Sequence, residues 1–313
     1  MWLLIFFVLI FLLLIILVNY MDGYRYLYIE HQNLFHLDRK YGDKPKIKNC
    51  IISLTTTPDR LKDIKTNLMS LLDSSMAVEE IRLNIPYYSC KGDKYKIPKW
   101  LKMLKSVTIH RVEKDMGPAT KLLPTLISLC EPMVKGHLKD VSKNKKIIVV
   151  DDDVIYGYYM VETLNNYFNK YNRNGKKVAV TMYGDKIGKN DYMDYSFYTR
   201  TKNYITGECY TDVLRGHSAY MVTPDMFKSD IYCYDNKPKE CFFVDDNYFS
   251  WHLKKNRVRI LMLGMAYKSI PLPDLMNCFT GGLHANHNGD GKNEQIVNRY
   301  YRRLAKHYHS SDI

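Results

Sequence analysis

The sequence of 313 residues predicts an α/β fold with a mixed, mostly parallel sheet flanked by helices. Short apolar runs, such as residues 50–54 and 146–150, alternate with longer segments of helical periodicity. This alternation is typical of parallel strands joined by crossover helices. Hydrophobic residues make up 46% of the chain and charged residues 25%, which excludes a disordered, collagen-like or disulfide-stapled chain.

Residues 1–20 form the first expected element, a transmembrane signal-anchor. Met1–Val18 is an unbroken apolar run, and at ~1.5 Å per residue it would span about 27 Å, close to the hydrocarbon thickness of a bilayer. A cleaved signal peptide is the competing interpretation, but no basic residue precedes the run and no small residues follow it as a cleavage site. Residues 21–48, polar and aromatic without a clear period, are expected to be a stem before a folded domain at residues 49–313.

Strands and helices alternate in the first half of this domain. Apolar runs predict five strands, at residues 50–54, 81–85, 107–109, 146–150 and 178–182. Three helices are predicted between them, at residues 59–72, 118–130 and 158–171. Pro118 suits the first turn of its helix. The second half is less regular, with strands predicted at residues 218–222 and 258–262 and helices at residues 242–255 and 293–308.

The most informative motif is the acidic triplet Asp151-Asp152-Asp153, which directly follows an apolar strand. Ligands of open α/β sheets bind beyond the carboxyl ends of the strands. Neighbouring buried carboxylates raise each other's pKa unless a cation neutralises them, and Mg²⁺ or Mn²⁺ commonly joins carboxylates to substrate phosphates. Asp151 and Asp153 point the same way in an extended segment. The triplet therefore predicts a metal and diphosphate site, with an acidic loop or helix cap as the alternative.

A second motif runs from Asp115 to Lys121, with the sequence DMGPATK. Gly117 and Pro118 predict a tight turn into a helix, whose N-terminus favours anions. Lys121 could then neutralise a phosphate, although an ordinary capped helix with a surface lysine explains the pattern equally well. The sequence contains neither a P-loop nor a dinucleotide-binding glycine motif.

Taken together, Ile52–Arg60, Asp115–Lys121 and the acidic triplet resemble glycosyltransferases of the GT-A fold, which use nucleotide-activated sugars. In that family a D-x-D motif follows a strand and holds a divalent metal against the diphosphate. The resemblance covers roughly residues 49–287. It implies a Rossmann-like sheet, Mn²⁺ or Mg²⁺ as the cofactor, and a UDP- or GDP-linked sugar as the donor.

The resemblance also implies roles for individual residues. Asp151 would meet the ribose and, with Asp153, bind the metal. The other expected contacts to the nucleotide sugar are Thr55, Thr57, Arg60, Asp115, Lys121 and Asp152. With the anchor, the resemblance implies a single-pass type II protein whose catalytic domain lies in the lumen of the ER or Golgi. The charges that flank the anchor nearly cancel and leave its orientation open.

An acidic pair in the segment FVDDNYFSW resembles the start of an acceptor-side helix in many GT-A enzymes. Inverting transfer needs a base that removes a proton from the acceptor hydroxyl. Asp246 is the expected base. Asp245 is the alternative, because the sequence has Asp-Asp where Glu-Asp is common, and a simple helix cap would explain both residues.

Three histidines are further candidates. His284 and His287, in the segment GGLHANH, are expected as metal ligands because some GT-A folds return a C-terminal histidine to the metal. His217 is expected on the acceptor side. Ordinary loops or turns would explain all three histidines equally well.

The leading hypothesis is therefore a metal-dependent, inverting glycosyltransferase that transfers a sugar to a glycan, glycoprotein or glycolipid. A sugar nucleotidyltransferase of related fold is one alternative, although the glycine-rich loop it would need near the first strand is absent. A catalytically inactive, membrane-anchored glycan-binding protein is the other. The formal net charge of +13 is dispersed along the chain, and the acidic motifs count against nucleic acid as a partner.

Overall fold

The computed structural model describes most of the chain, namely residues 6–7, 9–10, 24–130, 144–194, 208–233, 237–263, 272–273 and 291–310. The side chains of the last helix are described as far as Leu304.

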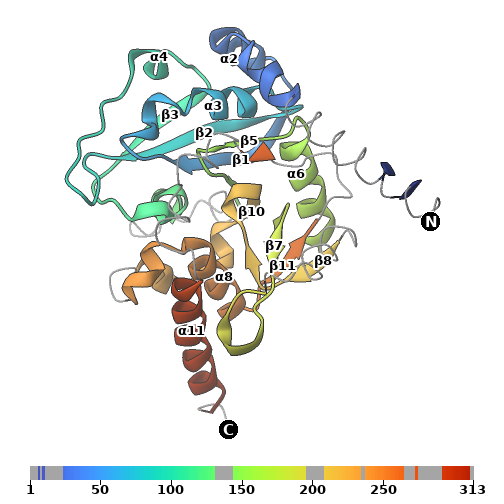
Figure 1. The fold of residues 1–313 in the computed structure, drawn as a ribbon, viewed down its shortest axis with the longest axis vertical. Coiled ribbons are helices and arrows are strands. Elements are labelled where there is room, and N and C mark those ends of the chain that lie inside the picture. The colour runs from blue at the N-terminus through green and yellow to red at the C-terminus, as the bar shows by residue number, and fades with distance from the viewer. Residues whose placement is uncertain are drawn as a thin grey trace.

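A mixed sheet of eight strands forms the centre of the molecule (Figure 1). Its strands are β1 (Lys46–Thr55), β2 (Ala77–Pro86), β3 (Val107–Val112), β4 (Lys146–Val149), β6 (Val178–Thr181), β8 (Cys209–Thr211), β10 (Tyr220–Val222) and β11 (Arg259–Met262). Their order is β3-β2-β1-β4-β10-β6-β11-β8. Only β10 and β8 run antiparallel to their neighbours, so the predicted mixed, mostly parallel sheet is confirmed.

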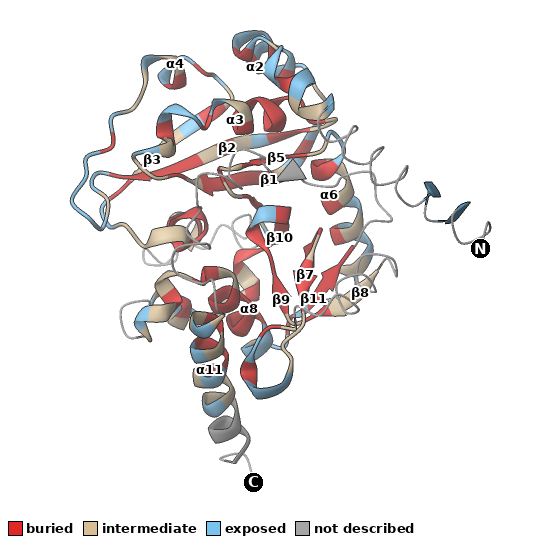
Figure 2. Ribbon diagram, viewed as in Figure 1, coloured by how far each residue is buried: buried red, intermediate tan, exposed pale blue. Residues whose placement is uncertain are grey.

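Helices cover this sheet, and its central strands are buried (Figure 2), whereas the edge strands β3 and β8 are partly exposed. The α-helices are α2 (Leu34–Gly42), α3 (Lys65–Leu72), α4 (Lys99–Lys102), α5 (Leu123–Cys130), α6 (Met160–Tyr171), α8 (Asp245–Lys255) and α11 (Lys292–Ser310). Residues 50–54 of β1 have no exposed side chain, as expected for a central strand with both faces covered. α6 packs on β6 and β10, and α11 packs on α8.

Shorter elements complete the fold. Two small antiparallel ladders pair β5 (Val154–Ile155) with β12 (Leu272–Pro273), and β7 (Gly184–Asp185) with β9 (Val213–Leu214). The 3₁₀ turns are η1 (Arg60–Lys62), η2 (Gly117–Lys121), η4 (Lys189–Asp191), η5 (Gly216–Ser218), η6 (Pro224–Met226), η7 (Ser229–Tyr232) and η9 (Lys239–Phe242).

Two predicted helices are shorter than expected. The helix predicted at residues 118–130 is divided into η2 and α5, with non-helical dihedral angles at Leu122. Pro124 lacks an amide hydrogen, so it cannot donate the backbone bond that would continue the helix across this point. The helix predicted at residues 59–72 is likewise divided into η1 and α3.

The segment expected to be a stem differs from the prediction. It contains α2, whose Leu34, Leu37 and Tyr41 belong to the hydrophobic core. These residues lie three and four positions apart and therefore share one helical face. β1 also begins at Lys46, inside the expected stem. The folded domain thus starts well before residue 49.

The predicted anchor lies almost entirely outside the described residues, which include only positions 6, 7, 9 and 10 of its 20. Within the part of the chain that the structure describes, no helix combines the length and apolar composition needed to cross a bilayer. The anchor stays a prediction.

Candidate functional site

The candidate site lies where the order of the strands reverses. The chain runs outward from β1 through β2 to β3, and then returns to place β4 on the other side of β1. In open α/β sheets, ligands bind at such a switch point, beyond the carboxyl ends of the strands. The loop after β1 and the acidic triplet after β4 both leave the sheet at this edge. The fold therefore brings two of the predicted motifs together.

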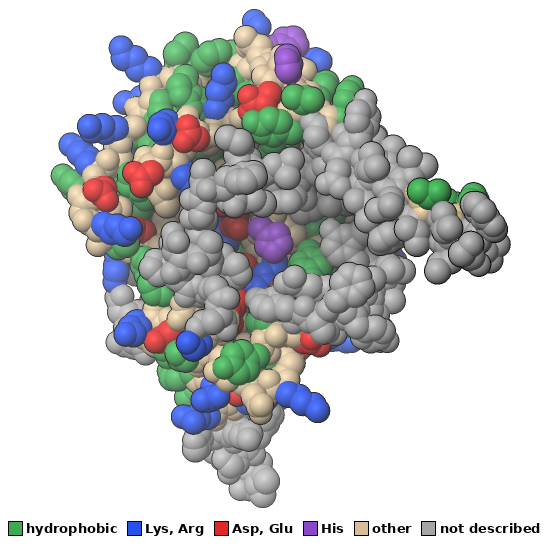
Figure 3. Space-filling model, viewed as in Figure 1, with side chains coloured by type: hydrophobic (Ala, Val, Ile, Leu, Met, Phe, Trp, Pro, Cys, Tyr) green, Lys and Arg blue, Asp and Glu red, His purple; other side chains and the backbone are tan. Residues whose placement is uncertain are grey.

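A single ammonium group connects this edge to the acidic pair at the start of α8. Lys121 Nζ lies 2.8 Å from Asp151 Oδ1, 2.9 Å from Asp245 Oδ2 and 3.3 Å from Asp246 Oδ1. The Lys121 side chain is only 4% exposed. Figure 3 shows acidic, basic and histidine side chains next to one another near the middle of the face it presents. The donor-side and acceptor-side carboxylates of the predictions thus meet at one buried cation.

The charges in this cluster stabilise each other. Burial alone would lower the pKa of Lys121, but Asp151, Asp245 and Asp246 outweigh this effect and hold the pKa well above its usual value. Burial would raise the pKa of Asp151, yet Lys121 lowers it below the usual range. Lys121 is therefore charged, and its charge keeps Asp151 ionised despite the loss of water.

The two acidic residues of α8 differ in their surroundings. Burial raises the pKa of Asp245 to about 7, although Lys121 opposes this rise. Asp246 is less buried and accepts a hydrogen bond at Oδ2 from the backbone N–H of Gly216, at 3.0 Å. The greater exposure of its carboxylate therefore favours Asp246 as the base, whereas a pKa near 7 favours Asp245.

Gly216 lies at the centre of the cluster, in η5. A Cβ atom at this position would lie 2.3 Å from Lys121 Nζ and 2.7 Å from Asp151 Oδ1. Real Cβ atoms do not approach other atoms so closely, so only glycine allows the turn before β10 to reach both charged groups.

Two side chains hold the backbone of the acidic triplet. The hydroxyl of Tyr156 accepts a hydrogen bond from the Asp151 N–H at 2.8 Å and lies 3.3 Å from the Gly216 carbonyl oxygen, to which it can donate. Asn67 on α3 donates to the carbonyl oxygens of Asp151 and Val154, at 2.9 and 2.6 Å. These contacts fix the turn that aims the triplet away from the sheet.

Arg60 pairs with the other two acids of the triplet. Its Nη2 lies 2.9 Å from Asp152 Oδ1, and its Nη1 lies 2.7 Å from Asp153 Oδ2. Burial raises the pKa of Asp152 to about 6 against the effect of Arg60, and it also raises the pKa of Asp153. Asp152 Oδ2 is buried and has no hydrogen-bond partner among the described residues. Asp152 thus lies inside the turn, and Asp153 is the more open of the two.

Three other predicted nucleotide contacts support local backbone. Thr55 Oγ1 donates to the Asn84 carbonyl oxygen at 2.8 Å, and Thr57 Oγ1 accepts from the Arg60 N–H at 3.4 Å. Asp115 accepts from the N–H groups of Gly117 and Cys90, each at 2.8 Å. No described contact joins these three residues to the Lys121 cluster, and their nucleotide roles stay predictions.

The histidines divide into two groups. His217 belongs to η5, beside Gly216, and has an exposed side chain. Partial loss of water lowers its pKa, although the carboxylate of Asp151 opposes this shift. His217 thus lies near Asp151, and its acceptor-side role stays a prediction. His284 and His287 lie outside the described residues, so their predicted metal contacts remain predictions.

The two predicted metal ligands, Asp151 and Asp153, are each paired with a different cationic side chain, Lys121 and Arg60. Both carboxylate side chains remain partly exposed, and a carboxylate has several acceptor positions beyond those used in one ion pair. No group of three or more His, Cys, Asp or Glu side chains suited to a metal occurs within the described residues. Mg²⁺ commonly binds to one or two carboxylates and completes its shell with water and substrate phosphates, so two carboxylates would suffice, and their metal role stays a prediction.

Sequence reasoning overlooked the residues that shape the cluster. Asn67, Tyr156 and Gly216 were not candidates, and neither was Tyr220, whose fully buried hydroxyl has no hydrogen-bond partner among the described residues. Most of their hydrogen bonds join positions 30 to 87 apart along the chain. The one available signal was the segment LRGHSAY, whose small residues Gly216, Ser218 and Ala219 resemble a turn before an acceptor-side strand.

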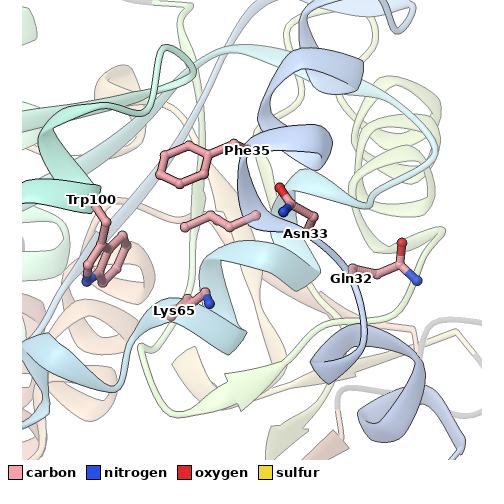
Figure 4. Close-up of a pocket in the computed structure, with 6 residues that line it drawn as sticks. Gln32, Asn33, Phe35, Lys65 and Trp100 are labelled. Atoms are coloured by element: carbon pink, nitrogen blue, oxygen red, sulfur yellow. The ribbon is translucent and has the colours of Figure 1, made fainter.

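A separate pocket lies between the starts of α2 and α3 and the short helix α4 (Figure 4). Its volume is about 220 Å³, and it is lined by Gln32, Asn33, Leu34, Phe35, Lys65 and Trp100. None of the predicted site residues lines it.

Comparisons with known proteins add one similarity. No family model and no curated protein sequence matches the chain. Among solved structures, the crystal structure of S. aureus TarS 1–349 is similar, with a TM-score of 0.40 and 14% sequence identity over 71% of this chain. The chain spans 60% of the length of that structure. Neither family nor function follows from a likeness at this level.

Proposed function

We propose that the chain is a metal-dependent glycosyltransferase that moves a sugar from a UDP- or GDP-linked donor to a hydroxyl group of a glycan, glycoprotein or glycolipid. One observation carries the proposal: Asp151 and Asp246 meet at the ammonium of Lys121, at the switch point of the sheet. A transferase needs a donor-side carboxylate and an acceptor-side base within reach of the same reacting atoms. The predicted anchor would make it a single-pass type II membrane protein.

The residues divide into a donor side and an acceptor side. A divalent cation held by Asp151 and Asp153 would stabilise the charge that develops on the departing diphosphate. Arg60 holds Asp153 in place through its ion pair. The other proposed donor contacts are Thr55, Thr57, Asp115, Lys121 and Asp152, and the proposed additional metal ligands are His284 and His287.

Asp246 is the proposed base. Its carboxylate removes the proton of the acceptor hydroxyl as that oxygen attacks the anomeric carbon and the bond to the diphosphate breaks, which inverts the anomeric configuration. Lys121 and the Gly216 N–H hold the Asp246 carboxylate in position. Asp245 is the second candidate because its pKa is about 7. His217 is proposed to contact the acceptor.

Two isosteric variants test the assignment of the base. With Mn²⁺ and a panel of UDP- and GDP-sugars, Asp246→Asn should lose about 10²–10⁴-fold in transfer rate, the usual effect of a missing general base, while donor binding remains nearly intact. Asp245→Asn should retain more activity than Asp246→Asn.

The matched control is Asp225→Asn, which removes a carboxylate paired with Lys177 outside the cluster and should transfer at the rate of the unaltered chain. Transfer by Asp246→Asn at that same rate would show the base assignment to be wrong. Absence of turnover and of nucleotide binding across the whole panel would instead favour an inactive glycan-binding protein.

A further inference from the structure

An exposed aromatic face lies close to the N-terminal end of the described fold. It consists of Tyr24, Leu27 and Tyr28 in the helical segment at residues 24–30, and of Tyr158 and Tyr159 at the start of α6. All five side chains are exposed. Contiguous exposed apolar surface commonly marks a place of contact with a membrane or another molecule.

Arg25 connects the two halves of this aromatic face. Its guanidinium lies 5.8 Å from the centre of the Tyr28 ring, and its Nη2 donates to the Tyr156 carbonyl oxygen at 3.2 Å. Arg25 also forms an ion pair with Asp73. Tyr158 and Tyr159 pack edge to face, with their ring centres 4.9 Å apart. Arg25 therefore ties the helical segment at residues 24–30 to the chain directly before Tyr158 and Tyr159.

The sequence limits how far this aromatic face can lie from the predicted anchor. Only five residues separate Val18, the end of the apolar run, from Tyr24. Six peptide steps at no more than ~3.6 Å each reach at most about 22 Å. The polar region on each side of the hydrocarbon core is itself about 5–8 Å thick. The helical segment therefore begins close to the lipid headgroups if the run spans the bilayer.

The chemistry of the aromatic face suits that position. Tyrosine is favoured at membrane–water interfaces because its ring is apolar and its hydroxyl group is polar. A cation is also present at this surface: Lys44 Nζ lies 5.9 Å from the centre of the Tyr158 ring. Basic side chains next to a membrane are attracted to anionic lipids.

We propose that the aromatic face of Tyr24, Leu27, Tyr28, Tyr158 and Tyr159 lies in the headgroup layer of the bilayer that holds the N-terminal anchor. This contact fixes the orientation of the folded domain on the membrane. It rests on the membrane attachment included in the proposed function, but it is independent of glycosyl transfer. Tyr156, whose hydroxyl group touches the candidate site, lies two residues before Tyr158, so the contact also sets the distance of the site from the lipid surface.

Hydroxyl-radical footprinting of the full chain in vesicles of neutral and anionic phospholipids tests this contact. Tyr158 and Tyr159 are 41% and 45% exposed in the structure, and Tyr87 and Tyr88 are 44% and 56% exposed. Without a membrane contact, the two pairs should be oxidised at similar rates. We expect the rates at Tyr158 and Tyr159 to be several-fold lower than those at Tyr87 and Tyr88.

A second measurement identifies what covers the aromatic face. A phospholipid with a photoactivatable headgroup should form adducts on peptides containing residues 24–28 and 158–159, and not on the peptide containing Tyr87 and Tyr88. Protection without lipid adducts would mean that another copy of the chain covers the face, and would overturn the proposal.

The outcomes distinguish a failure of the aromatic contact from a failure of the predicted anchor or of the proposed glycosyl transfer. Chains that float with the vesicles but show equal oxidation at the two tyrosine pairs would overturn the aromatic contact alone. Chains that fail to float would overturn both the contact and the anchor. Glycosyl transfer is not read in either measurement, so the proposed reaction is judged separately.

Discussion

Gly216 decides how closely the charged groups of the candidate site approach each other. Its backbone N–H donates to Asp246, and the missing side chain leaves space for the Lys121–Asp151 ion pair. Gly216 has no side chain of its own, yet its backbone positions the Asp246 carboxylate and leaves room for the Lys121–Asp151 ion pair. Because Lys121 is buried and Asp151 is only partly exposed, a small displacement of either group weakens their mutual stabilisation.

Gly216→Ala should destabilise the protein by about 1–3 kcal/mol, the usual cost of an overpacked interior. It should also reduce the rate of glycosyl transfer by more than this loss of stability explains. Urea unfolding and transfer assays measure the two effects. Gly42→Ala is the matched control, because a Cβ atom there would meet no described atom within 4 Å; its stability should change by less than about 0.5 kcal/mol. Equal behaviour of the two variants would contradict the tight packing at Gly216.

At the level of elements, the sequence predicted the positions of strands and helices better than the order of the strands in the sheet. The runs that predicted β4, β6 and β11 match these strands to within a residue, because apolar side chains and turn residues act over a few positions. The apolar periodicity of residues 118–130 predicted one continuous helix, although Pro124 is a local signal for its division into η2 and α5. The antiparallel insertion of β10 between β4 and β6 could not be predicted, because strand order depends on contacts between distant segments.

The candidate site likewise has residues that local patterns singled out and an arrangement that depends on distant segments. Local patterns singled out Asp151 and Asp153, which follow a predicted strand, and Asp246, which lies near the start of a predicted helix; their chemical roles stay predictions. Lys121 was predicted to face a phosphate, whereas its ammonium is buried among three carboxylates in the structure. That environment arises from α8, which follows Lys121 by more than a hundred residues, and no pattern around Lys121 itself encodes it.

The packing of α8 gives the protein a specific sensitivity to acid. His252 on α8 is 1% exposed, and neither ring nitrogen has a hydrogen-bond partner among the described residues. Burial lowers its pKa from 6.5 to about 4; Asp230, whose Oδ1 lies 3.8 Å from Nδ1, opposes this shift, and Lys237 and Lys255 reinforce it. The folded state thus prefers the neutral ring. The stability that this preference provides is complete above about pH 6.5 and is lost as the pH falls toward 4.

Between about pH 7.5 and about pH 5, His252 should therefore contribute a loss of about 2 kcal/mol in the free energy of unfolding. His252→Leu should remove this part of the pH dependence, because an apolar side chain has no proton to bind. Urea unfolding at the two pH values measures the difference. His36→Leu, which replaces an exposed histidine on α2, should leave the pH dependence unchanged. If His252→Leu loses as much stability as the unaltered chain, the buried imidazole is not the cause.

At the scale of the whole molecule, the sheet brings the proposed donor side and the proposed acceptor side of the site together. In the proposed reaction, the loops after β1 and β4 form the donor side and the carboxylates at the start of α8 form the acceptor side. The turn before β10 holds one of these carboxylates, Asp246, through the Gly216 N–H. Among the residues that the structure describes, the two sides meet at Lys121 and Gly216. If Asp151 and Asp153 hold the proposed cation, two carboxylates leave its shell incomplete, and a bound diphosphate should complete it.

Metal and nucleotide should consequently stabilise the protein cooperatively. In thermal unfolding of the detergent-solubilised full chain, Mn²⁺ with UDP or GDP should raise the Tm by more than the sum of the shifts with metal alone and nucleotide alone. A ligand at 100 times its Kd contributes about 2.7 kcal/mol, or several degrees in Tm for a protein of this size. Asp153→Ala should remove the excess, because the metal then loses one of its two carboxylates, whereas Asp246→Asn should keep it. Strictly additive shifts in the unaltered chain, or an excess that survives in Asp153→Ala, would mean that the acidic triplet does not join a cation to a diphosphate.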